Sequence, residues 1–567
     1  MTPALATPDF VRVHGLHVAA HNFRGEDAPI VSDVSFSIGK GEVLALIGES
    51  GSGKTTIALA LMGHTRAGCR ITSGSVHIGS TDVLSLGHKG LLDLRGREVS
   101  YIAQSAAASF NPARPLLDQV IESARTHGML SRAQAEAKAI EMFRSLSLPE
   151  PELIGRRYPH QLSGGQLQRM MAVMALITDP KLVILDEPTT ALDVTTQIDV
   201  LRSFKKLLSE CGTSAIYVSH DLPVVAQMAD YIVVLNCGRI RENGRCEELL
   251  SNPQDPYTRK LISAAKPHVR VQPRLHVQLA VDTLPAPAAT PALEIRGLVA
   301  GYGPIDAQGL PRKTVLRNVD LTLERGATLG VIGESGSGKS TLARVIAGLT
   351  PPAAGTITFN GKPLDAHIEG RTRDQLRRIQ IVFQNADTAL NPAHTVSGLL
   401  GRPLELYHGV RGAEREQRVT SLLDQVHLPR EIARRRCGEL SGGQKQRINL
   451  ARALAAEPDL ILCDEVTSAL DTVVGAAVLD LLIDLRRELN LSYLFISHDI
   501  STVRSICDDV LVLYRGEPVE SGAAEQVTTE PQHSYTALLM ACVPQLRPGW
   551  LEEAPARHAP ERSTEMP

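Results

Sequence analysis

The sequence GESGSGKTT occupies residues 48–56, and a nearly identical stretch, GESGSGKST, occupies residues 333–341, 285 residues later. Both fit the pattern GxxxxGK[ST], and each follows a short apolar run and precedes a helix-like stretch. Glycines at these positions let backbone N–H groups converge on phosphate oxygens, the lysine reaches the terminal phosphates, and the hydroxyl residue suits Mg²⁺. The chain therefore contains two predicted phosphate-binding loops.

Other motifs repeat in the same order. LSGGQ at residues 162–166 returns at residues 440–444, and the acidic pairs at 186–187 and 464–465 are also 278 residues apart. Such matches in one order indicate two duplicated domains, each with its own nucleotide machinery.

The repeat also predicts the domain boundaries. Residues 267–291 are rich in Pro, Ala and Val without helical or strand periodicity, which is typical of an exposed linker. We expect a first nucleotide-binding domain with a C-terminal extension over 1–266, the linker over 267–291, and a second domain with its extension over 292–545. The Pro-, Glu- and Arg-rich residues 546–567 are expected to be a disordered tail.

Within each half, short β-rich apolar runs such as EVLALIG and LVILDEP alternate with helical stretches such as SRAQAEAKAIEMFRSL. This pattern predicts an α/β fold. Buried strands that end at charged or glycine-rich turns favour a largely parallel sheet with ligands at the carboxyl ends of the strands.

Two apolar runs end in a pair of acids, LVILDE and LILCDE. A strand that ends in this way suits a metal-associated aspartate followed by a carboxylate that orients or deprotonates the attacking water. We assign Asp186 and Asp464 to the metal, and Glu187 and Glu465 to the water.

This order of motifs, a P-loop, LSGGQ, a strand with Asp-Glu, and a histidine after another strand, resembles the ATP-binding-cassette (ABC) family, and it covers nearly the whole chain twice. LSGGQ is the specific element, because other P-loop ATPases lack it. The resemblance implies two tandem P-loop ABC ATPase domains, each with a mixed or parallel β core and a helical subdomain. It also implies that the two cassettes of this chain pair and close, so that each ATP lies between the P-loop of one and the LSGGQ of the other.

The resemblance further implies individual roles. Gln104 and Gln384 match the glutamine that senses Mg²⁺, water and the membrane subunit, and His220 and His498 match the histidine that contacts the γ-phosphate. The predicted catalytic residues are Glu187, Glu465, His220, His498, Gln104 and Gln384, and the predicted Mg²⁺ ligands are Thr55, Gln104, Asp186, Ser340, Gln384 and Asp464. The predicted ATP-binding residues are Gly48, Ser50, Gly51, Gly53, Lys54, Thr55, Thr56, Ser163, Gly164, Gly165, Gln166, Asp193, Tyr302, Gly333, Ser335, Gly336, Gly338, Lys339, Ser340, Thr341, Ser441, Gly442, Gly443, Gln444 and Asp471.

Adenine stacks on an aromatic residue upstream of the P-loop in this family. Tyr302 is the candidate in the second half, whereas the first half leaves His21 and Phe23 open.

Composition narrows the class of protein. The formal net charge is −3 and no basic arm is present, so we expect no nucleic-acid partner. Apolar runs are much shorter than the roughly 20 residues that a membrane-spanning helix needs, and the start lacks the features of a secretory signal, so we expect the chain to stay in the cytosol. The eight cysteines form no CxxC pair, which favours reduced thiols.

Further stretches resemble the peptide, nickel and opine importer branch of the family, which includes dipeptide, oligopeptide and glutathione types. They are SAAASFNP and NADTALNP after each sensing glutamine, and NPQDPYTRKLISAAKP and EPQHSYTALLMACVP after each cassette. This resemblance implies two integral-membrane permease subunits, an external solute-binding protein that acts indirectly, and a peripheral position at the cytoplasmic face of the inner (cell) membrane. Many relatives hold an iron–sulfur cluster in the extension, but Cys542 is nearly alone here, so we expect ATP and Mg²⁺ and no cluster.

Two alternatives to an importer motor stay open at this point: a soluble cassette pair acting on ribosomes or nucleic acid, and the motor of an exporter. The transported solute is also left open among peptides, opines, nickel chelates, glutathione and glycosides. The second half departs from the family before its signature, where Arg436, Cys437 and Gly438 replace a Tyr-Pro-His sequence. Because both halves keep the residues expected to bind and hydrolyse ATP, we predict that both sites hydrolyse ATP.

Overall fold

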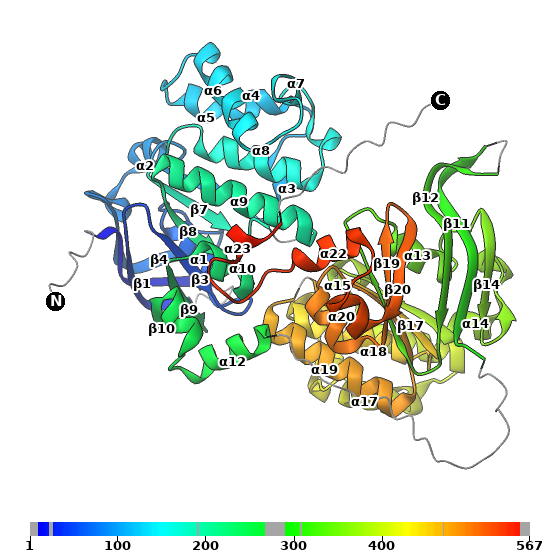
Figure 1. The fold of residues 1–567 in the computed structure, drawn as a ribbon. Coiled ribbons are helices and arrows are strands. Elements are labelled where there is room, and N and C mark those ends of the chain that lie inside the picture. The colour runs from blue at the N-terminus through cyan, green and yellow to red at the C-terminus, as the bar shows by residue number, and fades with distance from the viewer. Residues whose placement is uncertain are drawn as a thin grey trace, which may run out of the picture. The chain divides into compact units, whose positions relative to one another are not determined.

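A computed structural model describes residues 9–21, 27–189, 192–266, 290–306, 309–468 and 470–555. The chain divides into two compact units (Figure 1). The first contains the chain up to Lys266 together with the segment that begins at Pro544, and the second runs from Pro267 to Val543. The expected linker over 267–291 falls almost entirely outside the described residues.

The first unit contains two sheets. A four-stranded antiparallel sheet has the order β2-β1-β4-β5, and a six-stranded sheet has the order β10-β9-β3-β8-β7-β6. All neighbours in the larger sheet are parallel except β9 and β10. The strands are β1 (Asp9–His21), β2 (Asp27–Gly39), β3 (Val43–Ile47), β4 (Cys69–Ile78), β5 (Thr81–Asp82), β6 (Val99–Ile102), β7 (Leu182–Asp186), β8 (Ser214–Val218), β9 (Tyr231–Asn236) and β10 (Arg239–Arg245).

Helices surround the larger sheet and form a separate group around α8 (Figure 1). The first group consists of α1 (Lys54–Ala60), α2 (His88–Leu94), α9 (Val194–Cys211), α10 (Leu222–Met228), α11 (Cys246–Ser251), α12 (Pro256–Ala265) and α23 (Trp550–Glu553). The second group, the helical subdomain, consists of α3 (Ala106–Ser109), α4 (Leu116–Val120), α5 (Glu122–Thr126), α6 (Arg132–Ser145), α7 (Pro151–Ile154) and α8 (Gly164–Leu176).

The second unit repeats both sheets. Its antiparallel sheet has the order β12-β11-β14-β15, and its six-stranded sheet has the order β16-β17-β18-β13-β19-β20 with only β19 and β20 antiparallel. The strands are β11 (Leu293–Ile305), β12 (Pro311–Leu323), β13 (Thr328–Ile332), β14 (Ala354–Phe359), β15 (Lys362–Pro363), β16 (Ile379–Val382), β17 (Leu460–Asp464), β18 (Ser492–Ile496), β19 (Asp509–Tyr514) and β20 (Glu517–Ala523).

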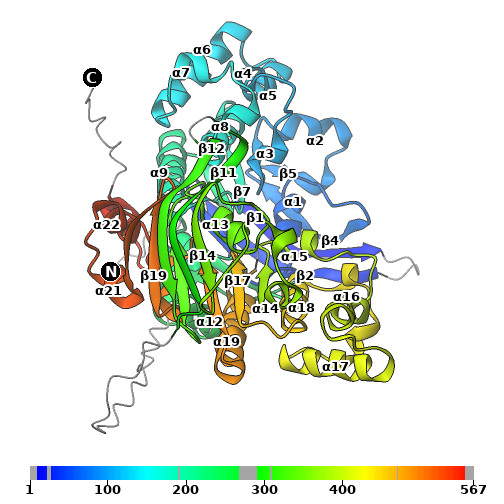
Figure 2. The ribbon, with the colours of Figure 1, turned by 90° about the vertical axis from the view of Figure 1, so that its right-hand side faces the viewer.

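The helices of the second unit repeat the two groups, and Figure 2 shows α16 and α17 at the edge of this unit. They are α13 (Lys339–Ile346), α14 (Arg373–Arg378), α15 (Ala386–Ala389), α16 (Val396–Pro403), α17 (Gly412–Gln425), α18 (Gly442–Leu454), α19 (Thr472–Leu489), α20 (Ile500–Ile506), α21 (Ala524–Thr529) and α22 (Ser534–Ala541). The predicted architecture, two α/β domains with mixed sheets and helical subdomains, is confirmed.

The core of each unit explains why these segments form these elements. Strand β7 is buried along its whole length, as its unbroken apolar run predicts for a parallel strand covered on both faces. In α9 the buried residues Ile198, Leu201, Phe204 and Leu208 recur at helical spacing, so one face of this helix packs inward. The core cluster of the first unit joins both sheets to α1, and a matching cluster joins the sheets of the second unit to α13. Each P-loop helix is therefore held on both sides.

The chain end differs from the expectation of a disordered tail after residue 545. The structure describes residues up to 555, and Trp550, Leu551 and Ala554 are buried in the first unit. The stretch was expected to be a tail because it is rich in Pro, Glu and Arg. That composition gave no indication that these three apolar side chains are buried. The rest of the expected tail, from residue 556, lies outside the described residues.

Candidate nucleotide sites

Each P-loop connects a strand to a helix at the edge of the larger sheet where the parallel strands have their carboxyl ends. In the first unit it joins β3 to α1, and in the second it joins β13 to α13. A Cβ on Gly48 would lie 2.1 Å from the carbonyl oxygen of Leu235, and one on Gly333 would lie 2.2 Å from that of Leu513. Only glycine fits this close approach, which explains the first glycine of each motif.

The P-loop lysines point into their own loops. The ammonium group of Lys54 donates to the carbonyl oxygens of Gly48 at 2.7 Å and Glu49 at 2.9 Å, and Lys339 makes the same pair of bonds in the second unit. Both lysine side chains are buried. A desolvated ammonium at the centre of a loop of N–H groups is suited to an anionic phosphate.

The predicted metal-associated aspartates lie beside the P-loop hydroxyls. Thr55 donates to Asp186 at 3.2 Å, and Ser340 donates to Asp464 at 2.9 Å. Burial raises the pKa of both aspartates above the ordinary value, and in Asp186 hydrogen bonds from Tyr101 and Thr55 oppose this shift. A buried carboxylate beside a hydroxyl is a set of hard oxygen donors, and such donors fit Mg²⁺.

The glutamates that follow are held by two side chains each. Gln104 donates to Glu187 at 2.9 Å, and Nδ1 of His220 lies 3.0 Å from the same carboxylate. In the second unit Gln384 donates to Glu465 at 2.7 Å, and Nδ1 of His498 lies 3.4 Å away. Three segments distant in sequence therefore meet at one carboxylate in each unit.

Both glutamates have a left-handed backbone. Their φ angles are 50° and 51°, a region that a non-glycine residue adopts at a cost of about 1–3 kcal/mol. Backbone N–H groups hold this conformation, because Glu187 donates to Val218 and Glu465 donates to Ile496. The chain turns sharply here, so the carboxylate faces the glutamine and the histidine.

The histidines are electrostatically coupled to the glutamates. Burial would lower the pKa of His220 and of His498, but the hydrogen bond and charge of the facing glutamate raise it above the ordinary value. Burial would likewise raise the pKa of Glu465, but His498 lowers it.

The LSGGQ motifs begin a helix in each unit. Ser163 caps α8 and accepts a bond from the N–H of Gln166, whose side chain in turn accepts from the N–H of Ser163. Ser441 and Gln444 form the same reciprocal pair at the start of α18. The motif thus acts as a helix cap in each unit, and the predicted role in ATP binding stays a prediction.

The second glycine of each signature is tightly packed. A Cβ on Gly165 would lie 2.2 Å from Cγ2 of Thr196, and one on Gly443 would lie 2.4 Å from Cγ1 of Val474. Asp193 caps α9 and Asp471 caps α19, so the start of each signature helix packs against the segment that carries the predicted aspartate.

The departure before the second signature leaves the local backbone unchanged. Pro159–Gln161 and Cys437–Glu439 each form a single 3₁₀ turn whose first residue is buried. Cys437 thus occupies the packing position of Pro159, and the same kind of turn precedes the signature in both units.

The candidates for the aromatic residue that stacks on adenine have different surroundings in the structure. Tyr302 is 40% exposed on β11, and its hydroxyl lies 3.2 Å from that of Thr341 in the P-loop helix. His21 is exposed at the end of β1 and pairs with Asp27. Phe23 lies outside the described residues, so the choice in the first half stays open.

Sequence reasoning did not single out two tyrosines that reach the P-loops. Tyr257 at the start of α12 accepts a bond from the N–H of Glu49 at 3.2 Å, and Tyr535 in α22 accepts from that of Glu334 at 2.9 Å. Both lie in the repeated Tyr-Thr motif of the C-terminal extensions, so the repeat itself was the available signal. Tyr101 donates a hydrogen bond to Asp186 at 2.7 Å. The equivalent position in the second unit holds Ile381, so the sequence repeat could not indicate this tyrosine.

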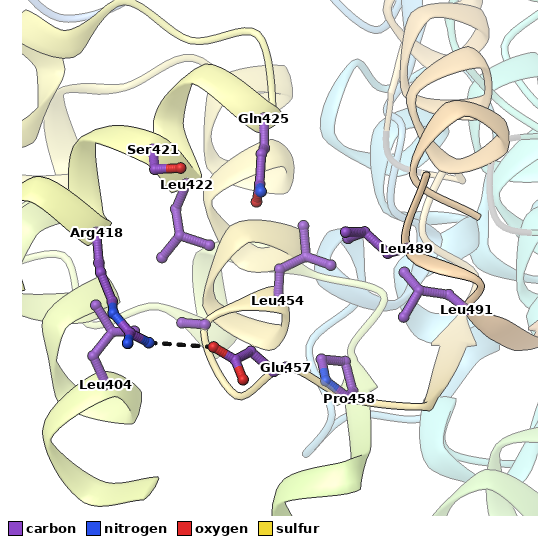
Figure 3. Close-up of a pocket in the computed structure, with 11 residues that line it drawn as sticks. Leu404, Arg418, Ser421, Leu422, Gln425, Leu454, Glu457, Pro458, Leu489 and Leu491 are labelled. Carbon is purple, nitrogen blue, oxygen red and sulfur yellow. Dashed lines mark hydrogen bonds and ion pairs between the residues drawn. The ribbon is translucent and has the colours of Figure 1, made fainter. Parts of the chain in front are cut away.

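The second unit also has a hollow away from these residues (Figure 3). It has a volume of about 480 Å³, lies between α17, the end of α18 and the turn before β18, and contains the ion pair of Arg418 and Glu457 at 3.2 Å. None of the predicted site residues lines it.

Among the described residues, no helix combines the length and the apolar character that crossing a bilayer requires.

Comparison with known families gives two matches in each half. A family model described as "ABC transporter" matches residues 31–190 and 316–468, and one described as "Oligopeptide/dipeptide transporter, C-terminal region" matches residues 242–289 and 519–567. The second pair covers the extensions that carry Tyr257 and Tyr535.

Several curated proteins are similar along nearly the whole chain. The glutathione import ATP-binding protein GsiA of Salmonella choleraesuis (strain SC-B67) is 38% identical, over 98% of this chain and 92% of the relative. Those of Pectobacterium atrosepticum and Escherichia coli (strain K12) are also 38% identical, over 96% and 91% of this chain and 91% and 87% of the relatives. A solved structure, cbiO1 from Clostridium perfringens, aligns with a TM-score of 0.38 at 28% identity, covering 42% of this chain and 92% of its own.

Proposed function

This chain belongs to the ABC transporter family and hydrolyses ATP, and from that premise we propose that it is the motor subunit of an importer for short peptides or peptide-like solutes. The observation that carries the proposal is a set of residues that occurs once in each unit. It consists of a P-loop lysine, a buried aspartate beside the P-loop hydroxyl, and a glutamate that a glutamine and a histidine contact. The extensions that match the oligopeptide/dipeptide model support the peptide class.

The proposed mechanism uses the residues of each unit as follows. The P-loop N–H groups and Lys54 or Lys339 hold the phosphates, and Glu187 or Glu465 orients the attacking water and accepts its proton. The histidine and the glutamine keep that carboxylate in place. Asp186 with Thr55, and Asp464 with Ser340, would hold Mg²⁺, which when bound neutralises charge on the phosphate oxygens.

Pairing of the two cassettes within one chain completes the proposal. Each unit contains a full P-loop and a full LSGGQ signature, so one chain supplies every part that two composite ATP sites need. We further propose two integral-membrane permease subunits as direct partners, a solute-binding protein as an indirect one, and a position at the cytoplasmic face of the cell membrane. No iron–sulfur cluster and no nucleic-acid partner are proposed.

The cargo is proposed from the relatives. These relatives are named for glutathione import, so glutathione is the first solute to test here. We propose that the permeases and the binding protein select the solute.

The test is reconstitution of the chain with its permeases and binding protein in proteoliposomes. We expect ATP hydrolysis to rise, and labelled glutathione or a short peptide to accumulate on the side opposite the binding protein, only when that protein is loaded. Accumulation in the other direction would indicate an exporter. Sedimentation with ribosomes in place of membranes would support the soluble alternative and overturn the proposal.

A further inference from the structure

The last described stretch of the chain, residues 544–555, returns to the first unit after the second cassette is complete. We call this stretch the clasp. It includes α23, and its side chains Trp550 and Leu551 are 4% and 1% exposed. Figure 1 shows α23 beside α9 and α10 of the first unit.

The backbone of the clasp is held by a buried amide. The side chain of Gln227 in α10 donates to the carbonyl oxygens of Gln545 and Arg547, both at 2.8 Å, and accepts from the N–H of Leu551 at 3.0 Å. Gln227 is only 2% exposed. Within its own helix the amide nitrogen also donates to the carbonyl oxygen of Pro223 at 3.3 Å, so three of its four hydrogen bonds are made to the clasp. Loss of the clasp would leave the amide oxygen of a buried side chain without this donor, which is costly.

A guanidinium group holds the far end of the clasp. Arg202 in α9 donates to the carbonyl oxygens of Leu551 and Pro555 at 2.9 and 3.0 Å, and also to that of Ala554. Lys205, one turn further along α9, pairs with Glu552 at 2.6 Å. A cation at the carboxyl end of a short helix satisfies carbonyl groups that the helix leaves unpaired.

This docking surface is built on one cassette only. The positions that correspond to Arg202, Lys205 and Gln227 in the second cassette, 278 residues later, hold Asp480, Ile483 and Ser505. There the positive charges and the long amide are absent, so the counterpart surface lacks the groups that hold the clasp. The duplication has therefore diverged at these three positions.

The clasp also lies on the two helices that leave the first nucleotide site. Asp193 caps α9, and His220 directly precedes Asp221, the cap of α10. A segment that fixes α9 and α10 together thus fixes the starts of both site segments.

We propose that the clasp is an intramolecular fastener that keeps the two cassettes joined when no nucleotide is bound. The chain passes between the units twice, through residues 267–289 and between Val543 and Pro544. Only residues 542–549 separate α22 from α23, and a short tether raises the effective concentration of one cassette around the other more than a long one does.

The test cuts the other connection. A protease site is placed within residues 267–289 of the full chain, the chain is cleaved without nucleotide, and the halves are followed by size-exclusion chromatography. In the parent chain they are expected to elute together. In an Arg202→Ala, Gln227→Ala double variant they are expected to separate, because docking of the clasp weakens by at least about 10-fold when its anchoring hydrogen bonds are lost.

The matched control is the Asp480→Ala, Ser505→Ala variant, which changes the corresponding positions of the second cassette and should elute like the parent. A third variant, Leu551→Asp, changes the clasp and leaves both cassettes intact, and it should separate like the double variant. Separation of the parent halves, or co-elution of the Arg202→Ala, Gln227→Ala halves, overturns the proposal.

Trp550 provides an independent measurement, because it is the only tryptophan in the chain. In the uncut parent its emission should be that of a buried indole and resist quenching by acrylamide. In the Arg202→Ala, Gln227→Ala variant the emission should shift to the red and become readily quenched, while circular dichroism stays unchanged. Equal emission and quenching in parent and variant would show that these residues do not hold the clasp, which overturns the proposal.

Discussion

At the residue scale, the two sites differ in detail around the same chemical groups. His220 lies 3.0 Å from Glu187, whereas His498 lies 3.4 Å from Glu465, and only Asp186 has a tyrosine hydroxyl as an extra partner. The strained backbone is the same in both glutamates. Strain of this kind persists only where the surroundings impose it, so the same local contacts hold the glutamate backbone in both units.

We predict that both sites hydrolyse ATP. Loss of a general base lowers the rate by about 10²- to 10⁴-fold, so Glu187→Gln and Glu465→Gln should each silence their own site. We propose that both cassettes share one closing motion, so each single variant should lose well over half of the transporter-stimulated ATPase rate. Glu210→Gln, an exposed acid on α9, is the control and should keep the parent rate. One dead variant beside one with near-parent turnover would show unequal sites.

The coupling of histidine and glutamate predicts a pH effect without nucleotide. The raised pKa of His498 stabilises the fold fully below its ordinary value of about 6.5, and this contribution is lost as the pH rises through the folded value. The lowered pKa of Glu465 stabilises the fold above its ordinary value of about 4.5, and that part is lost as the pH falls. The melting temperature of Glu465→Gln should therefore fall below that of the parent most clearly between about pH 4.5 and 6.5.

The same coupling is measurable directly. NMR titration of the imidazole groups should give a lower pKa for His498 in Glu465→Gln, and for His220 in Glu187→Gln, than in the parent. An unchanged histidine pKa in both variants would mean that the glutamate does not control the histidine charge.

At the element scale, each C-terminal extension is connected to its P-loop by one tyrosine hydroxyl. The start of α12 is itself fixed, because Glu242 in β10 accepts from the N–H groups of Gln254 and Asp255. Glu520 in β20 does the same for Gln532 and His533 before α22. A rigid extension thus presents a hydroxyl to the second residue of each loop.

We predict that Tyr257→Phe and Tyr535→Phe weaken ATP binding and leave the fold intact. One net hydrogen bond is worth about 0.5–1.5 kcal/mol, so the ATP dissociation constant of the affected site should rise by about 2- to 10-fold. The expected signature is a higher KM with little change in kcat, because the carboxylates are untouched. Tyr158→Phe, a change at an exposed tyrosine, serves as the control, and a fall in kcat alone would contradict the prediction.

At the scale of the whole molecule, one chain contains two complete cassettes, and the first also holds residues 544–555. An ABC motor made of separate chains must first find its partner, whereas here both cassettes are always present at a fixed ratio. We propose that closure on ATP is therefore an intramolecular step, whose free-energy cost does not depend on protein concentration.

We predict that ATP compacts the chain without dimerising it. In the Glu187→Gln, Glu465→Gln double variant, which binds ATP and does not turn it over, small-angle scattering should report a smaller radius of gyration with ATP. Sedimentation should report an unchanged mass. The control carries Lys54→Ala and Lys339→Ala in addition and should not respond to ATP. An obligatory two-chain form with ATP would contradict intramolecular closure.

The sequence alone determined the duplication and the fold class, and it indicated the candidate site residues, because each of these depends on local patterns. A P-loop needs glycines where the backbone approaches another strand, a buried parallel strand needs an unbroken apolar run, and both are visible as letters in order. The comparisons confirm the family that these patterns indicated. The roles of the individual site residues stay predictions.

Only the tertiary structure decided which distant residues meet. It placed Tyr257 and Tyr535 on the P-loops, and it placed the clasp on Arg202 and Gln227 of the first unit. The sequence could not show these contacts, because each joins segments far apart in the chain through a single hydroxyl, amide or guanidinium group. Such groups do not recur with a regular spacing in the sequence. The polar residues around Trp550 therefore predicted a solvated tail, and only the structure shows the surface that buries this side chain.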